Sequence, residues 1–328
     1  MALAIRFHDQ HDDQPADSLR EDVLAGFAAT PKAISPKHFY DQRGSELFEQ
    51  ICLQPEYYPT RTEEQILRDA ADDIAALAGP GACLLELGSG ASRKVRLLLE
   101  RLRPASYLGI DISRDFLRSS TQQLAADYPW LEVHAACADF SRPLQLPPEL
   151  RSSRPLAFFP GSSIGNFTPV EARRFLLNLH GLLPLGGGLL IGVDLIKDQG
   201  VLEAAYNDAA GVTAAFNLNL LERIRSELDS DIEPDRFVHR AFYNEALNRI
   251  EMHLLSPRAQ QVRIEGRRFQ FAAGESLHTE ISCKYSVESF CDLARSAGFT
   301  PRALWTDPQQ LFSVHYLQTG PRGPMAVA

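Results

Sequence analysis

Strand-like runs that alternate with helical stretches constrain the fold of this chain more than any other feature of its sequence. Between residues 83 and 195, short apolar runs typical of buried strands are separated by stretches with helical periodicity. The strand-like runs are Cys83–Leu87, Tyr107–Ile112, Leu131–Ala136, Leu156–Pro160 and Leu189–Leu195, and the helical stretches lie near Ser92–Arg101, Arg114–Tyr128 and Pro169–Leu183. This alternation predicts an α/β fold with a parallel, doubly wound sheet.

The first strand-like run leads into a glycine-rich turn, in the sequence CLLELGSGASRK at 83–94. Gly88 and Gly90 have no Cβ, so backbone N–H groups can approach a ligand closely where open α/β sheets bind nucleotides. The dinucleotide fingerprint has a third glycine where this chain has Arg93, which argues against NAD. An acidic residue before the turn, here Glu86, resembles the first motif of class I S-adenosylmethionine (SAM)-dependent methyltransferases.

Polar residues after the next two strands suit a nucleoside cofactor. Asp111 ends the second strand, where a carboxylate can accept hydrogen bonds from both ribose hydroxyls. Asp139 and Phe140 follow the third strand and offer a carboxylate for the adenine amine and an apolar neighbour for its ring. Lys94, after the glycine turn, can meet the methionine carboxylate. A lone Gly-x-Gly is common and an aspartate at a strand end is often a helix cap, but the ordered set indicates a nucleoside cofactor.

Composition limits the partners and the compartment. The 328 residues carry a net charge of −9 and no basic patch, which makes a nucleic-acid partner a poor candidate. The longest apolar stretch, 182–196, is broken by proline, glycines and Asp194 and is too short for a membrane span. Five cysteines without a C-x-x-C pair and no signal-peptide pattern predict reduced thiols in the cytoplasm. We expect a monomer, and we interpret HDQHDD at 8–13, with His8 and His11, as a frayed polar terminus without a metal.

A second, smaller α+β domain is expected outside the alternating region. A helical region runs from Lys197 through Leu228 with an interruption near Gly211, and the strand-like segments after it are Phe237–Asn244, Arg249–Ser256, Gln261–Ile264 and Arg268–Ala272. A final pair of strands, Phe299–Thr306 and Leu311–Gln318, resembles the last two strands of the class I methyltransferase sheet. We predict a Rossmann-like SAM-binding domain from residues 62–197 and 284–328. Residues 1–61, of which 1–20 are loosely ordered, and 198–283 form the substrate-binding domain, with a pocket between the two domains.

Seven segments spread over nearly the whole chain resemble the histidine-specific methyltransferases of ergothioneine biosynthesis. They are FYDQRGSELFEQI (39–51), PEYYPTRTE (55–63), ELGSGASRK (86–94), PGSSIGNFTP (160–169), AYNDAAGVTAAFN (205–217), RIEMHL (249–254) and TEISCKY (279–285). These motifs are long and unusual. Fungal methyltransferases of the ergot alkaloid pathway share the broader family, so the resemblance indicates the family more firmly than the substrate.

The resemblance implies transfer of three methyl groups from SAM to the α-amine of L-histidine, with S-adenosylhomocysteine and the betaine hercynine as products. It places the cofactor residues at Gly88, Lys94, Asp111, Asp139 and Phe140. Its substrate residues fall on Tyr57, Asn166, Tyr206, Glu280 and Ser282, with Tyr40, Phe48, Gly161, Thr213 and Met252 close by. The resemblance further implies that Asn166 and Tyr206 hold the amine, Tyr57 helps to hold the carboxylate, and Glu280 and Ser282 bind the imidazole nitrogens.

The chemistry of these residue types agrees with such a site. A carboxylate and a hydroxyl can bond both imidazole nitrogens, and Glu-x-Ser on a strand puts both side chains on one face. Methyl transfer needs a neutral amine in line with the sulfonium, so catalysis is mostly positioning and desolvation. Tyr206 and Asn166 can orient the amine lone pair, and we assign no strong general base. Aromatic faces such as that of Phe48 can stabilise the quaternary ammonium product.

Each residue also has a purely structural interpretation. Glu280 can be a surface carboxylate paired with an arginine, the tyrosines can be ordinary packing aromatics, and Asn166 can shape a turn. Met252 on an alternating strand is more often a core residue. Only the co-occurrence of these residues favours function.

Three other functions remain open at the level of the sequence. A family member that methylates another amine, such as an indole amino acid, would need a smaller residue than Met252 and no acid at Glu280. A nicotinamide-dependent oxidoreductase would need a glycine at Arg93. A cofactor-binding module without activity would not need Asn166, Tyr206 and Glu280 together.

Overall fold

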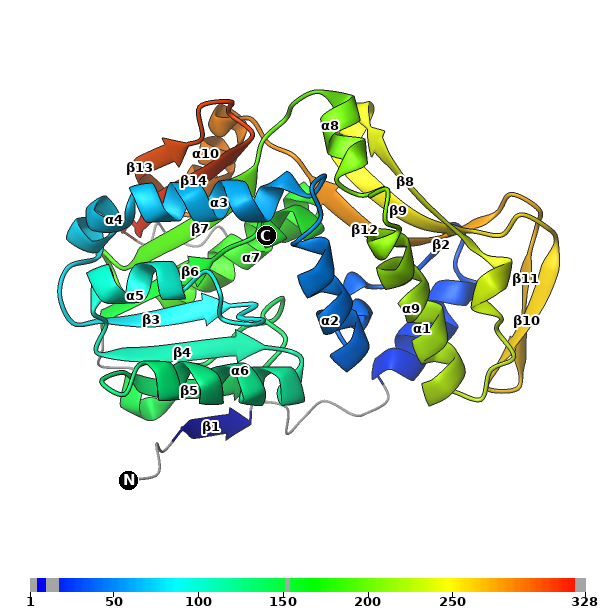
Figure 1. Ribbon diagram of the computed structural model, residues 1–328, viewed down its shortest axis with the longest axis horizontal. Helices are drawn as coiled ribbons and strands as arrows, with labels where there is room; N and C mark the ends of the chain where they lie inside the picture. Colours follow the sequence, from blue (N-terminus) through cyan, green and yellow to red (C-terminus); the bar gives the residue numbers. More distant parts are fainter. Residues whose placement is uncertain (1–4, 10–17, 151–153, 322–328) are drawn as a thin grey trace. The chain divides into compact units, whose positions relative to one another are not determined.

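The computed structural model describes residues 5–9, 18–150 and 154–321, and this part of the chain forms two compact units (Figure 1). The first unit contains strand β1 (Arg6–Asp9), Pro59–Ile196 and the chain from Cys283 onward. The second unit runs from helix α1 (Ser18–Ala28) to Tyr58 and includes Lys197–Ser282. The chain therefore leaves the first unit and returns to it.

The first unit is built on an eight-stranded sheet in the order β1-β5-β4-β3-β6-β7-β14-β13. Its strands after β1 are β3 (Ala82–Leu87), β4 (Ser106–Asp111), β5 (Glu132–Cys137), β6 (Arg154–Phe159), β7 (Gly188–Asp194), β13 (Phe299–Thr306) and β14 (Phe312–Thr319). Neighbouring strands from β1 to β7 are parallel, whereas β14 is antiparallel to both β7 and β13. The expected α/β doubly wound sheet with a closing hairpin is confirmed.

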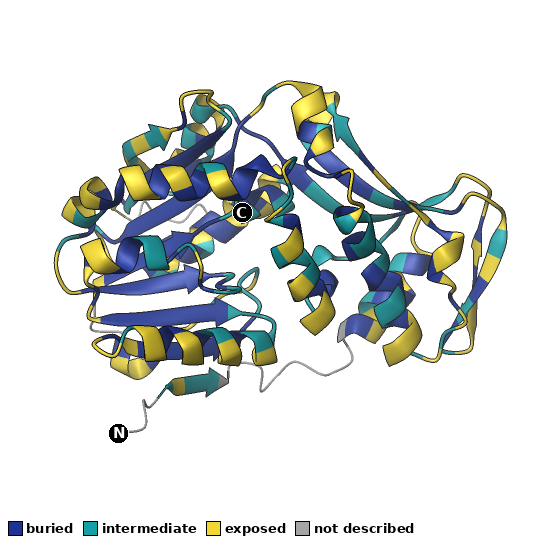
Figure 2. Ribbon diagram, in the orientation of Figure 1, coloured by how far each residue is buried: buried dark blue, intermediate teal, exposed yellow. Residues whose placement is uncertain are grey.

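Helices cover this sheet because its strands are apolar on both faces, as parallel sheets require. The helices are α3 (Tyr58–Asp69), α4 (Ala71–Ala78), α5 (Arg96–Leu102), α6 (Arg114–Asp127), α7 (Pro169–Leu182) and α10 (Val287–Ser296). In Figure 2 the central strands are buried throughout, while the covering helices expose their outer sides.

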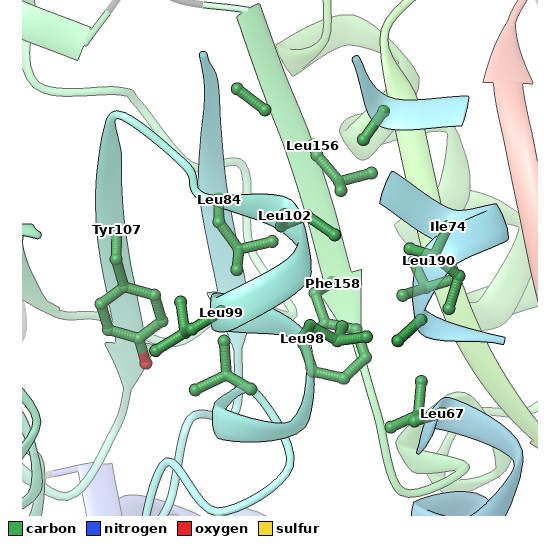
Figure 3. Packing of buried hydrophobic residues seen from close by; sticks show 14 of the residues in the cluster. Leu67, Ile74, Leu84, Leu98, Leu99, Leu102, Tyr107, Leu156, Phe158 and Leu190 are labelled. Carbon is green, nitrogen blue, oxygen red and sulfur yellow. The ribbon is translucent and has the colours of Figure 1, made fainter. Parts of the chain in front are cut away.

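The largest apolar cluster of the first unit joins α3, α4 and α5 to one face of the sheet. Figure 3 shows the labelled side chains: Leu67, Ile74, Leu98, Leu99 and Leu102 from the helices, and Leu84, Tyr107, Leu156, Phe158 and Leu190 from the strands. Successive residues of a strand point to opposite faces, so Phe159 faces away from this cluster. Its ring packs against Phe175 of α7, with 4.7 Å between ring centroids.

The second unit contains a four-stranded sheet in the order β2-β12-β9-β8, covered by α9 (Val212–Glu227). Its strands are β2 (Lys32–Ala33), β8 (Val238–Asn244), β9 (Arg249–Leu255) and β12 (Ser276–Cys283). Helix α2 (Gln42–Ile51) packs against α9, and α8 (Gln199–Ala204) contacts β8. A separate hairpin, β10 (Gln260–Ile264) and β11 (Arg267–Phe271), packs Phe269 and Phe271 against Phe27 of α1.

Three local expectations were wrong. Residues 1–20 were expected to be loosely ordered and to belong, with the rest of 1–61, to the second domain, but Arg6–Asp9 pairs in parallel with β5. An uncovered strand edge offers unpaired N–H and C=O groups, and β1 satisfies those of β5. The helix expected over Thr62–Leu77 is broken at Ala70 into α3 and α4. The helix expected from Ser92 begins only at Arg96, because Ser92 has a φ of +51°.

Among the described residues, no helix combines the length and the apolar character that a membrane crossing requires. Of the two histidines in the HDQHDD segment, His8 lies in β1 and His11 lies outside the described residues.

Candidate active site

The glycine-rich turn lies at the carboxyl end of β3, where its backbone is fixed by the neighbouring strand. The N–H groups of Gly88 and Ser89 both donate to the Ile110 carbonyl of β4, at 2.8 and 3.1 Å. Gly88 has a φ of +69°, and a Cβ there would lie 3.4 Å from the Phe140 ring. Within the described structure, a Cβ on Gly90 would meet no heavy atom within 4 Å, so this part of the turn borders open space.

Two aspartates follow adjacent strands of the same sheet edge. Asp111 ends β4 and accepts hydrogen bonds from the N–H groups of Gly90 and Ser113, each at 2.9 Å. Burial raises the pKa of Asp111, although these backbone donors partly oppose the shift. Asp139 follows β5 and accepts from the N–H of Ser141 at 2.9 Å and from its hydroxyl at 2.5 Å. The Asp111 carboxylate is therefore held by the glycine turn and by its own loop, and the Asp139 carboxylate by its own loop.

The Phe140 ring closes the apolar side of this edge. It packs edge-on against Phe159 and Phe175, with ring centroids 5.4 and 6.2 Å away. The Phe140 ring also lies against Gly88. All five residues expected to bind the cofactor belong to the first unit: Gly88, Lys94, Asp111, Asp139 and Phe140.

Lys94 is held by a carboxylate that sequence reasoning did not single out. Its ammonium lies 2.6 Å from Oε2 of Glu63, which is fully buried on α3. The backbone N–H of Gly161 also donates to Glu63, at 2.9 and 3.1 Å from the two carboxylate oxygens. Glu63 lies inside the PEYYPTRTE motif, but nothing in the helical pattern marked it as buried.

Glu86 lies on β3 beneath the turn and is also buried. The Tyr107 hydroxyl donates to its carboxylate at 2.6 Å, and the Ser92 hydroxyl lies 3.3 Å from that phenol oxygen. Burial raises the pKa of Glu86 to about 8, against the opposing effects of the Tyr107 hydrogen bond and of the Lys94 charge. Glu86 thus stabilises the floor of the turn as a partly protonated acid at neutral pH.

Asn166 and Gly161 lie on the segment after β6, so these two substrate candidates belong to the first unit. Asn166 ends a single helical turn over Ser163–Asn166. The hydroxyl of the preceding Ser162 accepts a hydrogen bond from the Asp194 N–H at 2.8 Å. Directly after the turn, Thr168 begins α7 with a capping box to Glu171. Both ends of the Asn166 turn are therefore anchored.

The second unit gathers the aromatic substrate candidates into one cluster. Ring centroids are 5.9 Å apart between Tyr40 and Phe48, 6.3 Å between Phe48 and Tyr57, and 6.3 Å between Tyr57 and Tyr206, all edge-to-face. Phe216 of α9 lies against both Tyr40 and Phe48, a member that sequence reasoning missed. Burial raises the pKa of Tyr57 well above its usual value, and nearby Tyr206 adds to the shift.

Tyr206 connects this cluster to β12. Its hydroxyl donates to the Ser282 hydroxyl at 2.8 Å, and both residues are buried. Glu280 lies two residues earlier on β12 and is half-buried, and its charge contributes to the raised pKa of Tyr57. The structure therefore places Tyr57, Tyr206, Glu280 and Ser282 in one neighbourhood.

Thr213 and Met252 are buried parts of the scaffold beside this neighbourhood. Asp208 accepts hydrogen bonds from the N–H groups of Val212 and Thr213, both at 2.7 Å, which fixes the start of α9. Met252 lies on β9, and its carbonyl accepts from the Thr279 hydroxyl of β12 at 3.1 Å. Both residues are buried, and these hydrogen bonds hold their backbones in place.

Two groups of side chains have the ligand types that metal ions prefer. They are His8, His134 and Glu149 in the first unit, and Glu251, His253 and His278 in the second. In each group the imidazole rings stack, with only 7° and 22° between their planes. Because nitrogen lone pairs lie in the ring plane, stacked rings direct them along parallel planes instead of toward one ion. Glu251 in addition accepts a hydrogen bond from Arg249 at 2.9 Å. We describe both groups as hydrogen-bonded clusters.

The strand order, the inserted β14 and the glycine turn at the carboxyl end of β3 define a class I methyltransferase fold. The sequence pattern of the family described as histidine-specific methyltransferase, SAM-dependent, matches residues 19–319. The chain belongs to this family, and it is a SAM-dependent enzyme.

Three relatives illustrate its range. A histidine N-alpha-methyltransferase of Mycolicibacterium smegmatis is 46% identical, over 90% of this chain and 93% of its own. One from Mycobacterium tuberculosis is 42% identical, over 88% and 91%. A 4-dimethylallyltryptophan N-methyltransferase of Claviceps purpurea is 26% identical, over 89% and 92%.

The residues at the carboxyl edge of the first sheet suit SAM. Asp111 and Asp139 offer acceptors for hydroxyl and amine groups, Phe140 offers an apolar ring, and Lys94 offers a cation. Gly90 leaves open space where a side chain would otherwise project.

Proposed function

We propose that this enzyme transfers three methyl groups from SAM to the α-amino group of L-histidine. The products are hercynine and S-adenosylhomocysteine, and the reaction is the first step of ergothioneine biosynthesis. The observation that carries this proposal is the 46% identity to a histidine N-alpha-methyltransferase over nine-tenths of the chain.

Histidine is held by the neighbourhood around Tyr206 in this proposal. Glu280 and Ser282 bind the imidazole nitrogens, Tyr57 helps to hold the carboxylate, and Tyr206 and Asn166 orient the amine. The hydrogen bond between Tyr206 and Ser282 supports this assignment, because it fixes the direction of two hydroxyls in this neighbourhood.

The cofactor is held at the carboxyl edge of the first sheet. Asp111 accepts the ribose hydroxyls, Asp139 accepts the adenine amine, Phe140 contacts the adenine ring and Lys94 binds the methionine carboxylate. SAM supplies an electrophilic methyl group on its sulfonium. The backbone hydrogen bonds of Asp111 support its role, because they fix the carboxylate before any ligand arrives.

The residues of the chain act on the amine by orientation instead of covalent attack. The attacking nitrogen must be neutral, and its lone pair must point along the S–CH3 axis. In each transfer the N–CH3 bond forms as the S–CH3 bond breaks, and the nitrogen loses a proton after the first and second transfers so that it is neutral again. The third transfer leaves a permanent ammonium, which the faces of Phe48 and Tyr40 can stabilise.

A family member with an indole amino acid as substrate is the nearest alternative. The Claviceps relative named for 4-dimethylallyltryptophan is only 26% identical to this chain. A larger ring would need a smaller residue than Met252 and would not need an acid at Glu280, which suits an imidazole N–H. Both residues support histidine.

We further propose that the enzyme is a cytoplasmic monomer that needs no metal and binds no nucleic acid. Light scattering during size-exclusion chromatography tests the monomer, and activity after treatment with a chelator tests the metal requirement. A dimer, or loss of activity that added metal restores, contradicts the corresponding statement.

The deciding experiment incubates purified enzyme with SAM and an equimolar mixture of the protein amino acids, followed by mass spectrometry. We expect trimethylated histidine and no other methylated amino acid. Methylation of a different amine would retain the enzyme class but refute the assignment of Glu280. Measured SAM binding with no methylated product would refute the proposed reaction.

A further inference from the structure

Glu63 occupies a position that is unusual for a carboxylate. It lies in the first turns of α3, and its side chain has no exposed surface. Removing a carboxylate from water is costly unless charges and hydrogen bonds compensate it. A buried acid at this place therefore needs specific partners.

Those partners come from two separate segments of the first unit. The Lys94 ammonium lies 2.6 Å from Oε2 of Glu63, and the Gly161 N–H donates to both carboxylate oxygens. A third segment makes room for it, since a Cβ on Gly192 of β7 would overlap the Glu63 carboxylate. The surrounding structure is thus shaped around this group.

The next residue on the helix has the same chemistry but other neighbours. Glu64 is also buried, but it pairs with Arg68 at 2.9 Å and with Arg93 at 2.6 Å, whose side chains are about half exposed. Neither arginine is among the residues that we assign to cofactor or substrate. Glu64 therefore provides a matched control for Glu63.

Lys94 can serve two carboxylates at once. An ammonium has three donor hydrogens, which is enough to bind Glu63 and a second carboxylate. Lysine ends a flexible stem, so the anchor at Glu63 limits where the ammonium can lie. Without Glu63, the largely buried ammonium would lose its counter-ion, which disfavours the charged form that an anionic ligand needs.

We propose that Glu63 is a positioning residue for the cofactor. It holds the Lys94 ammonium where it binds the methionine carboxylate of SAM, while the Gly161 N–H fixes the orientation of Glu63. The inference rests on the proposed function for the role of Lys94. Glu63 itself does not touch the ligand, because it has no exposed surface.

The test measures SAM binding to the full chain by calorimetry for the wild type and the variants E63Q, E64Q, K94M and E63Q/K94M. Glutamine at 63 keeps one acceptor oxygen for the Gly161 N–H, and it replaces the charge and the second acceptor with an NH2 group. We expect E63Q and K94M each to weaken SAM binding by about tenfold or more, and E64Q by less than about threefold. Histidine affinity, measured with S-adenosylhomocysteine present in saturating amounts, should change less than SAM affinity.

The double variant separates positioning from general structural damage. If Glu63 acts through Lys94, E63Q/K94M binds SAM no more weakly than K94M alone, because the second change removes an effect that is already lost. Losses that add in the double variant would overturn the inference. If E63Q alone does not fold, this comparison of the double variant with K94M still decides.

The outcomes also distinguish this inference from the proposed function. Normal SAM binding by K94M would refute the role of Lys94 in the proposed function and, with it, the inference. Weak binding by K94M with normal binding by E63Q would refute only the role of Glu63. Methylation of an amine other than histidine would leave the Glu63 inference intact.

Discussion

At the scale of single residues, two buried carboxylates of the first unit differ in their partners. Glu63 lies beside a cation and a backbone N–H, whereas the hydrogen bond to Glu86 comes from the neutral phenol of Tyr107. The pKa of Glu86 rises to about 8 because burial outweighs that hydrogen bond. Neighbours, and not residue type, decide the charge of a buried acid.

Glu86 predicts a stability that falls as the pH rises. Its folded pKa of about 8 exceeds the ordinary 4.5, so the folded state binds the extra proton between these values. The contribution of Glu86 to the free energy of unfolding is therefore largest below about pH 4.5. It decreases as the pH rises to about 8, by at most about 5 kcal/mol. Glu86→Gln keeps an acceptor for Tyr107 and should flatten the profile of melting temperature between pH 6 and pH 9. A variant whose melting temperature declines as steeply as that of the wild type would refute the raised pKa.

The two ligand sites predict opposite binding defects. Glu280→Ala should reduce histidine affinity by about tenfold or more and leave SAM affinity nearly unchanged, because a charge-assisted hydrogen bond to the imidazole is lost.

Asp111→Ala should weaken SAM binding by a similar factor while the protein stays folded. Calorimetry with each ligand measures both. Equal loss of both ligands in Glu280→Ala, or unfolding of Asp111→Ala, would show that the residue is structural.

At the scale of elements, apolar patterning located the strands of the main sheet to within two residues. Buried parallel strands are continuous apolar runs, so their positions can be predicted from local sequence. The position of strand β1 could not be predicted in this way, because Arg6–Asp9 is polar and pairs with β5, which is far away in the sequence. The break at Ala70 was missed for a related reason: alanine favours helices, and no local signal marks the end of α3.

We expect the cap that Asp208 forms at the start of α9 to affect substrate binding. Burial alone would raise the pKa of Asp208, but hydrogen bonds from Thr213 and Val212 hold it below its usual range. Asp208→Ala removes these bonds and should lower the free energy of unfolding by roughly 2 kcal/mol. It should also raise the KM for histidine, because Thr213 and Phe216 lie on α9. Ser286→Ala on α10 is the control: it removes a cap in the first unit and should cost about 1 kcal/mol. An unchanged histidine KM in Asp208→Ala would contradict the link.

At the scale of the whole molecule, the candidate site residues come from many segments of a chain that crosses four times between two units. Motifs could select Tyr57, Tyr206 and Ser282 as candidates, because each lies in a distinctive sequence segment. Their contacts could not be predicted, since the hydrogen bond from Tyr206 to Ser282 joins residues 76 positions apart. Glu63 escaped notice for the same reason: its partners, Lys94 and Gly161, are brought to it only by the folded sheet.

Buried histidines predict how the whole molecule responds to acid. His315 on β14 is fully buried, and burial lowers its pKa from 6.5 to about 4. The unfolded chain therefore binds a proton that the folded chain refuses, so stability falls as the pH drops from about 6.5 to about 4, by about 3 kcal/mol for this residue. Burial also lowers the pKa of His38, His134, His239, His253 and His278, which act in the same direction.

His315→Gln retains a polar group near the Ser313 hydroxyl, which lies 2.9 Å from Nε2 in the wild type. Chemical denaturation at pH 7 and pH 5 should show a smaller loss of stability for the variant than for the wild type. Equal losses would mean that His315 does not contribute to acid sensitivity.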